Sequence, residues 1–223
     1  MLILALDTTT TAGSAALLRD GGVLHEVASD PSRPQAARLP AELEAILARA
    51  GAALEHVDAF AVGTGPGSFT GLRVGVATMQ GLAVAMGKPL FGVSALDALA
   101  RLAAAPRVAT WVDAWRGEVY GALYEDGREV APPTVARPEE LLRGVAGRPT
   151  VFTGDGARMH QAVIHAALGA DARLTDPVAP LVAGAIGALA ADAFLAGLRP
   201  APDAIRPLYV RRSDAELARD RSS

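Results

Sequence analysis

The stretch GTGPGSFTGLRVG occupies residues 63–75 and joins an apolar run, residues 57–62, to a helix-forming segment of small residues. It holds five glycines and one proline in thirteen residues. Because glycine has no Cβ, such positions let a ligand or another backbone come close. Pro66 fixes one φ angle, which favours a loop of one defined shape. The stretch therefore predicts either a phosphate-binding loop or a tight packing joint.

The glycine spacing does not match the common phosphate-binding loops. No Gly-Lys-Ser/Thr follows it, as a Walker A loop requires, and residues 65–71 do not have GxGxxG spacing. Ser68 lacks the frame of a nucleophile elbow and has no identifiable His/Asp partner, so a catalytic serine is not expected. The sequence thus favours a structural joint. Its motif residues are Gly63, Gly65, Pro66, Gly67, Ser68, Phe69, Thr70 and Arg73.

The helix predicted over residues 70–86 carries small residues where larger ones are usual. Gly71 and Gly75 form a GxxxG pair, and each interior glycine costs a helix about 1 kcal/mol relative to alanine. That cost favours close approach, either to the chain's own sheet or to a partner helix. The helix predicted over residues 35–50 adds a leucine stripe. The predicted partner interface consists of Leu39, Leu43, Leu47, Gly71, Leu72, Gly75 and Met79.

Composition bounds the class of protein. The chain has 223 residues, of which 51% are hydrophobic and 20% are charged, so it has enough apolar surface to fold around a sizeable core. Its net charge of −3 gives no basic field for independent nucleic-acid binding. It has no cysteine, which excludes disulfides, thiol nucleophiles and Cys-ligated metals.

No segment predicts a membrane anchor or a leader. The apolar run at the N-terminus is short and lacks basic residues before it, unlike a signal peptide. The apolar stretch 178–198 is broken by Pro180 and Asp192 and is rich in alanine, which favours a buried core helix. A cytoplasmic location is therefore expected.

The predicted elements follow one order twice: three strands, helix, strand, helix, strand, helix. In the second half this pattern includes a strand over 128–131 and helices over 157–168 and 178–196. The repetition predicts an α/β fold of two similar lobes that face each other across a cleft. This is the duplicated plan of the actin, Hsp70 and sugar-kinase (ASKHA) proteins. We expect an N-terminal lobe over 1–104, a C-terminal lobe over 105–210 and a tail over 211–223.

In the ASKHA plan, nucleotide phosphates lie between turns at the starts of the two lobes. The turn after the first predicted strand has Asp7, Thr8 and Thr9 but no early glycine. The matching turn of the second half begins at Asp113, and a Trp and an Arg stand where small residues are expected. These four residues mark a vestigial nucleotide site. The alternative is that Asp7 and Thr8 only cap the end of a strand.

The histidines do not predict a metal site. His25, His56, His160 and His165 form neither HxxxH nor HExxH, and the last two lie five residues apart. Solvated surface histidines are the expected explanation. We therefore expect neither a metal nor a cofactor.

Motifs spread over the whole chain resemble those of the TsaB (YeaZ) family. They are LALDTTT at 4–10, GTGPGSFTGLRVGVA at 63–77, SALDALA at 94–100, DAWRGEVYGALY at 113–124 and PLYVRRSDAEL at 207–217. The resemblance implies an ASKHA-like fold and a role as the non-catalytic dimerisation subunit of the complex that makes threonylcarbamoyladenosine in tRNA. It also implies that the metal-binding histidine pair of the catalytic paralogue, TsaD, is absent here.

The resemblance further implies the partners. TsaD would bind through the helices over 35–50 and 70–86, the P-loop ATPase TsaE would bind the resulting heterodimer, and tRNA would be met only through the complex. Self-association through the same surface is left open. One departure from the family pattern is Gln35-Ala36-Ala37, where relatives usually carry His-Ser-Glu.

Two other functions compete with this scaffold role. An ATP-dependent small-molecule kinase is consistent with the two-lobed plan and with Asp7 and Asp113, but no substrate-binding insertion is recognisable. A metallopeptidase follows only from analogy with the catalytic paralogue, and the histidine spacing argues against it.

Overall fold

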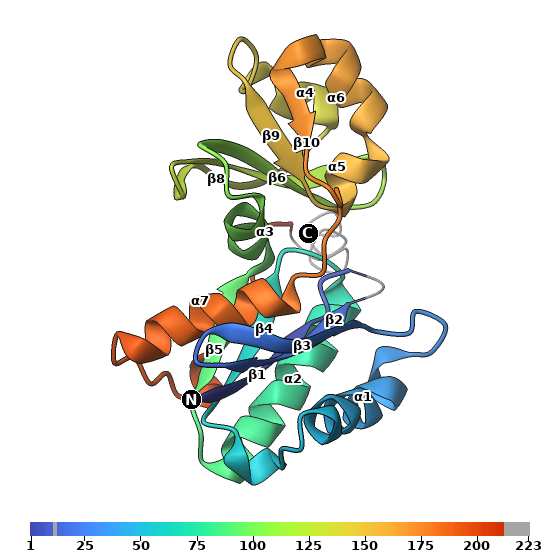
Figure 1. The fold of residues 1–223 in the computed structure, drawn as a ribbon. Helices are drawn as coiled ribbons and strands as arrows, with labels where there is room; N and C mark the ends of the chain where they lie inside the picture. The colour runs from blue at the N-terminus through green and yellow to red at the C-terminus, as the bar shows by residue number, and fades with distance from the viewer. Residues whose placement is uncertain (11–12, 212–223) are drawn as a thin grey trace, which may run out of the picture.

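Two five-stranded mixed sheets of the same strand order form the framework of the protein (Figure 1). The computed structural model describes residues 1–10 and 13–211. The first sheet has the order β3-β2-β1-β4-β5 and the second has β10-β9-β6-β7-β8. Each is therefore an antiparallel meander extended by two parallel strands, which confirms the predicted duplication. The strands are β1 (Leu2–Asp7), β2 (Ser14–Arg19), β3 (Gly22–Ala28), β4 (Ala59–Gly65), β5 (Leu90–Ser94), β6 (Arg107–Asp113), β7 (Val119–Glu125), β8 (Arg128–Ala136), β9 (Thr150–Thr153) and β10 (Ala172–Leu174).

Helices cover both faces of the first sheet. Alternate side chains of β1 point to opposite faces, as strand geometry requires. Leu4 and Leu6 join the core under α1 (Gln35–Arg49) and α2 (Phe69–Met86). Ile3 and Ala5 join the core shared with α3 (Ala95–Ala103) and α7 (Ala183–Leu195). Because β1 is covered on both sides, all six of its residues are buried.

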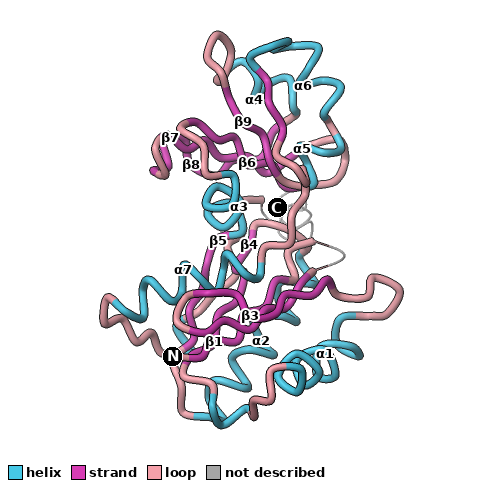
Figure 2. Tube along the Cα trace, viewed as in Figure 1, coloured by secondary structure: helices cyan, strands magenta, loops and turns pink. Residues whose placement is uncertain are grey.

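Helix α3 lies between the two sheets and links them (Figure 2). Ser94 caps its N-terminus by accepting hydrogen bonds from the backbone N–H groups of Leu96 (3.2 Å) and Asp97 (3.5 Å). The second sheet is covered on its outer face by α4 (Pro138–Arg143), α5 (Asp155–Met159) and α6 (Gln161–Leu168).

Three element boundaries differ from the sequence prediction. The helix predicted over 157–168 starts earlier, at Asp155, and is divided into two helices. The division lies at His160, whose φ of −109° and ψ of 20° are not helical. The helix predicted over 178–196 begins only at Ala183. Pro180 disfavours a helical conformation of Ala179, so a helix does not run through from 178. Strand β8 extends to Ala136, beyond the predicted 131.

The C-terminal part of the second half returns to the first sheet. Helix α7 packs across β1, β2 and β4. Beyond it, Gln80 of α2 donates to the backbone oxygens of Pro202 (2.9 Å) and Ile205 (3.1 Å), and Leu208 N donates to Thr64 O (2.7 Å). Segments after residue 105 thus pack on the first sheet, so cutting the chain between residues 104 and 105 does not separate the two lobes. The proposed lobe boundaries stay a prediction. Apart from Arg211, the expected tail lies outside the described residues.

Among the described residues, α2 is the one helix with the length and apolar composition that a membrane span requires. It lies on β4 and is closed at its C-terminus by Gly87, whose φ is 63°. The apolar stretch 178–198 does not meet the same test in this structure, since its helix has only 13 residues.

Candidate functional site

Four of the five glycines of residues 63–75 pack against Asp7, Thr8 or Thr9 at the end of β1, and the fifth, Gly65, packs on Leu72 and Leu208. A Cβ on Gly63 would lie 2.7 Å from Asp7 Oδ1. A Cβ on Gly71 or Gly75 would approach Thr8 O or Thr8 Oγ1 to less than 3.0 Å, a distance that real Cβ atoms essentially never show. Gly67 stands in the same relation to the backbone of Thr9. The stretch is thus a packing joint, and the element that comes close is the chain's own first turn.

The loop also starts α2. Ser68 is the N-cap residue, and its Oγ accepts a hydrogen bond from Gly71 N at 3.3 Å. Its own N–H donates to Thr9 O at 2.7 Å, which ties the loop to the end of β1. Phe69, Thr70 and Arg73 are exposed, so the motif has a buried part and a surface part.

The second lobe repeats this joint. The turn between β9 and α5 carries Gly154 and Gly156, and Gly154 packs so closely on β6 that a Cβ would lie less than 3.0 Å from Trp111 O. A Cβ on Gly156 would lie 3.0 Å from the carbonyl carbons of Trp111 and Val112. Both parallel βα turns therefore use glycine to press against the central strand beside them.

Three carboxylates line a cavity of about 370 Å³ between the lobes: Asp7, Asp113 and Asp155. The Oδ1 atom of Asp7 accepts Thr9 N at 3.0 Å, and burial raises the pKa of this carboxyl to about 6. Asp155 Oδ1 accepts the backbone N–H groups of Asp113 (3.0 Å) and Gly156 (2.9 Å). Burial raises the pKa of Asp155 too, and the charge of Asp113 adds to the shift.

The structure brings Asp7, Thr9 and Asp113 together, as the nucleotide-site prediction requires, and adds Asp155. Asp155, in the turn Gly154-Asp155-Gly156, was not among the site residues that the sequence predicted. The duplication could have indicated Asp155, because its turn is the counterpart in the second lobe of the glycine stretch in the first lobe. Thr8 is not among the residues that line the cavity, since its hydroxyl lies against Gly75.

The cavity is chemically poor for phosphate. Of the described residues that line it, Arg158 is the one cationic side chain, and it is exposed. Trp115 and Arg116 occupy the β6–β7 turn with φ angles of 56° and 59°. The described ranges contain no group of three or more His, Asp or Glu side chains placed to hold a metal ion.

The seven predicted interface residues are all buried within the chain itself. Leu39, Leu43, Leu47 and Met79 belong to the core beneath α1 and α2, and Leu72 is 1% exposed. The explanation that Gly71 and Gly75 let a partner helix come close is wrong, because both pack on Thr8.

An open apolar groove of about 660 Å³ runs between α1 and α2. Leu43 and Leu47 form part of its floor. Gly81 also lines the groove, and a Cβ on this residue would have no atom within 4 Å. Its other lining residues are Pro40, Glu44, Ala48, Ala52, Ala53, Leu54, Ala77, Thr78 and Leu82. At the entrance of α1, the side-chain amide of Gln35 lies against Gly71.

Comparison with known proteins gives the family. A family model described as "TsaD: tRNA N6-adenosine threonylcarbamoyltransferase" matches residues 5–218. The tRNA threonylcarbamoyladenosine biosynthesis protein TsaB of Haemophilus influenzae is 35% identical, over 70% of this chain and 72% of that protein. The structure of YeaZ from Pseudomonas aeruginosa superposes with a TM-score of 0.74 at 33% identity, covering 93% of this chain and all of the other.

This chain belongs to the TsaB (YeaZ) family. The predicted resemblance is thereby confirmed, and the chain is a TsaB-family protein of tRNA threonylcarbamoyladenosine biosynthesis. A Mycobacterium leprae relative is 34% identical over 96% of this chain but longer, so this chain spans 56% of its length.

The family fold is of the ASKHA class, which confirms the predicted architecture. The activator of 2-hydroxyisocaproyl-CoA dehydratase from Clostridium difficile, whose structure holds ADPNP, shares the fold with a TM-score of 0.60. It is 10% identical to this TsaB-family chain, so the likeness is one of fold alone.

Proposed function

We propose that this chain is a non-catalytic scaffold subunit of a tRNA threonylcarbamoyltransferase complex. It binds TsaD and supports that enzyme in forming threonylcarbamoyladenosine next to the tRNA anticodon. TsaE joins the resulting heterodimer, and tRNA is met only through the complex. The setting is the cytoplasm.

The observation that carries the proposal is the groove between α1 and α2. Its lining is mostly apolar and open, and an open apolar groove is a surface that binding to another protein would stabilise. The small residues Ala77 and Gly81 leave room for a helix of a partner. Two of the residues predicted for the interface, Leu43 and Leu47, belong to the lining of this groove. Self-association of the chain through the same groove is left open.

The cavity between the lobes supports a non-catalytic role. Asp155 Oδ1 accepts two backbone N–H groups, and the one cationic side chain of the described lining, Arg158, is exposed. The lining therefore offers little positive charge to hold the phosphates of a nucleotide substrate. The Thr8 hydroxyl, which would face phosphate in a nucleotide site, is packed on Gly75.

The test is reconstitution with TsaD and TsaE from the same organism. We expect the chain to co-purify with TsaD as a stable complex in size-exclusion chromatography, and we expect tRNA modification to require it. Full modification by TsaD and TsaE without this chain would contradict the proposal.

The alternative is an ATP-dependent small-molecule kinase, and the cavity with Asp7, Asp113 and Asp155 is the observation that favours it. Isothermal titration calorimetry at millimolar ATP separates the two functions. A kinase requires saturable nucleotide binding, whereas the scaffold does not.

A further inference from the structure

Three segments far apart in the sequence place aromatic and arginine side chains at the N-terminal end of α2. The Arg73 guanidinium lies 3.9 Å from the centre of the Phe69 ring. Its Nε donates to Tyr209 Oη at 3.1 Å, and the two rings are 5.1 Å apart. Trp115 lies on the β6–β7 turn, which Arg211, two residues after Tyr209, contacts through Ala114 O. We call Phe69, Arg73, Trp115 and Tyr209 the aromatic–arginine patch.

The patch is exposed yet held in place. Phe69 is 37% exposed and Tyr209 is 46% exposed. The backbone under Tyr209 is fixed by the hydrogen bond from Leu208 N to Thr64 O, at 2.7 Å. Arginine stacked on an aromatic ring loses little further freedom when it binds a ligand. The side chains of Phe69, Arg73 and Tyr209 therefore form a surface that is ordered before a ligand binds.

Trp115 is tied to the same C-terminal segment. Arg211, two residues after Tyr209, donates from Nη1 to Ala114 O at 2.8 Å and pairs with Glu118. Trp115 itself is 45% exposed at a φ of 56°. A bulky residue rarely adopts this conformation, and neither burial nor turn geometry explains a tryptophan here.

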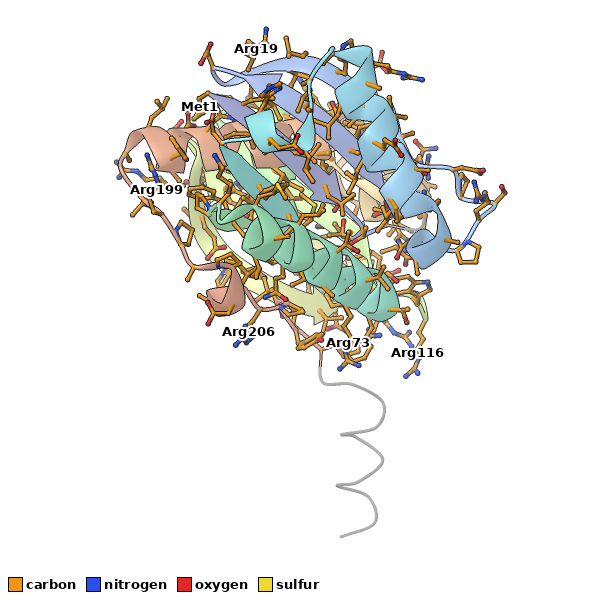
Figure 3. The ribbon with its side chains drawn as sticks, turned by 90° about the horizontal axis from the view of Figure 1, so that it is seen from below. Met1, Arg19, Arg73, Arg116, Arg199 and Arg206 are labelled. Carbon is orange, nitrogen blue, oxygen red and sulfur yellow. The ribbon has the colours of Figure 1, made fainter. Side chains whose placement is uncertain are left out.

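Arginine is concentrated around the patch although the whole chain is acidic. Arg73 lies against the Phe69 and Tyr209 rings, Arg211 pairs with Glu118, and Asp113 Oδ1 accepts the Trp115 N–H in the same turn. Figure 3 shows that Arg73 and Arg116 project from the same edge of the molecule. Exposed rings interleaved with arginine are typical of surfaces that stack unpaired nucleotides and contact their phosphates.

We propose that the aromatic–arginine patch stacks unpaired bases of an RNA loop. This inference rests on the proposed function, because the complex would present such a loop on its tRNA. The patch lies on the flank of α2 that faces residues 202–209, whereas the groove lies on the flank that faces α1. RNA and TsaD can therefore be bound at the same time.

Because tRNA is met only through the complex, the isolated chain is expected to bind an RNA loop weakly, and its tryptophan fluorescence tests the patch at high RNA concentration. The chain has two tryptophans, of which Trp111 is 2% exposed and packs edge-on against Phe152. Titration with an anticodon stem-loop RNA to about 1 mM, which covers weak nonspecific affinities, is expected to quench Trp115 in a saturable manner when tryptophan is excited at the red edge of its absorption, where RNA absorbs little. Trp115→Phe keeps the Trp111 signal and is expected to show no quenching.

Affinity variants locate the contact. Tyr209→Ala is expected to weaken RNA binding about tenfold, the loss of one stacked base. Arg73→Gln is expected to weaken it and to reduce its dependence on salt concentration. The matched control is Arg19→Gln, an exposed arginine at the opposite edge in Figure 3, which is expected to leave affinity unchanged.

Four outcomes would overturn the inference. These are no quenching at any RNA concentration, equal quenching by heparin, displacement of RNA by polyglutamate at equal charge concentration, and loss of TsaD binding in Tyr209→Ala. Heparin would show that charge alone suffices, and the last two would assign the patch to a protein. Failure of the wild-type chain to co-purify with TsaD would contradict the proposed function and leave the fluorescence result to decide the patch.

Discussion

The two ends of helix α2 carry glycines in opposite surroundings. Near the N-terminus, Gly71 and Gly75 are buried, and a Cβ on either would collide with Thr8. Two turns further on, Gly81 is exposed, and a Cβ would meet nothing within 4 Å. The first pair holds the helix against the end of β1, whereas the last opens a groove toward α1.

The difference between the buried and the exposed glycines of α2 distinguishes residues that stabilise the fold from residues that are free to serve a partner. The glycines that make the sequence conspicuous are needed for the chain's own joint, and a substitution there acts on stability. Of the small residues that follow, Gly81 costs the helix about 1 kcal/mol relative to alanine, and no internal contact requires a glycine there. A surface that accepts this cost is a better candidate for partner binding than the glycine motif itself.

Gly75→Leu tests the buried side of the comparison and has the largest expected effect. The new side chain has to displace Thr8, whose Oγ1 lies where the Cβ would be placed. Overpacking at a rigid backbone contact is expected to lower the free energy of unfolding by more than about 3 kcal/mol. Urea denaturation followed by circular dichroism measures it.

A double-mutant cycle keeps this test specific. Gly75→Ala alone is expected to be costly, and Thr8→Ala is expected to reduce that cost because it removes the hydroxyl and methyl groups nearest the new Cβ. Additive costs would show that Gly75 is required for a reason other than its contact with Thr8.

Local patterns predicted most of the fold. Asp20-Gly21 turns β2 into β3 with φ angles of 51° and 82°, and Ser94 caps α3, both from short-range signals. The break at His160 was not predictable from the pattern, because apolar spacing continues through it. The return of α7 to the first sheet depends on contacts between residues about 170 positions apart, such as Ala183 N donating to Ser14 Oγ.

The site was harder to predict than the fold. Asp7 and Asp113 could be found because each ends the first strand of a half. The sequence could not show what Gly71 and Gly75 pack against. A GxxxG pair indicates close packing, but it does not tell the chain's own turn from a partner helix. Phe69 and Arg73 were assigned to the loop motif, but only the structure brings them to Tyr209, more than a hundred residues away.

The carboxyl of Asp7, beside the buried joint, links the comparison to pH. Its pKa is raised from 3.8 to about 6 by burial, so the folded state holds the proton more tightly than the unfolded state. This contribution to stability is present at about pH 4 and is lost as the pH rises through 6. The free energy of unfolding is expected to fall by up to about 3 kcal/mol by neutral pH on account of this group.

Asp7→Asn isolates that effect, because asparagine does not titrate and can still accept the hydrogen bond from Thr9 N. Urea denaturation of both proteins at about pH 4.5 and pH 7 is expected to show a smaller loss in the variant. If the free energy of unfolding changed equally with pH in the two proteins, Asp7 would be ionised throughout this range.

Gly81→Leu tests the open side of the comparison. The leucine is expected to fill the groove without an internal clash, and so to weaken binding to TsaD at least about tenfold while the melting temperature holds. Biolayer interferometry with immobilised TsaD measures the affinity. Val84→Leu, at a residue of the same helix that is 66% exposed, is the matched control. Unchanged affinity in Gly81→Leu would place the interface outside this groove.

Gly81→Ala has the smallest expected effect and completes the contrast with Gly75→Ala. Position 81 is helical and exposed and has no atom within reach of the new methyl group. Alanine removes the glycine penalty in the helix, so the free energy of unfolding is expected to rise by about 0.5–1 kcal/mol. The same substitution thus has opposite signs at two glycines of one helix, and thermal unfolding of both variants measures the difference. Destabilisation by Gly81→Ala would show that this end of α2 is also packed against the chain, and would remove the argument that its small residues serve a partner.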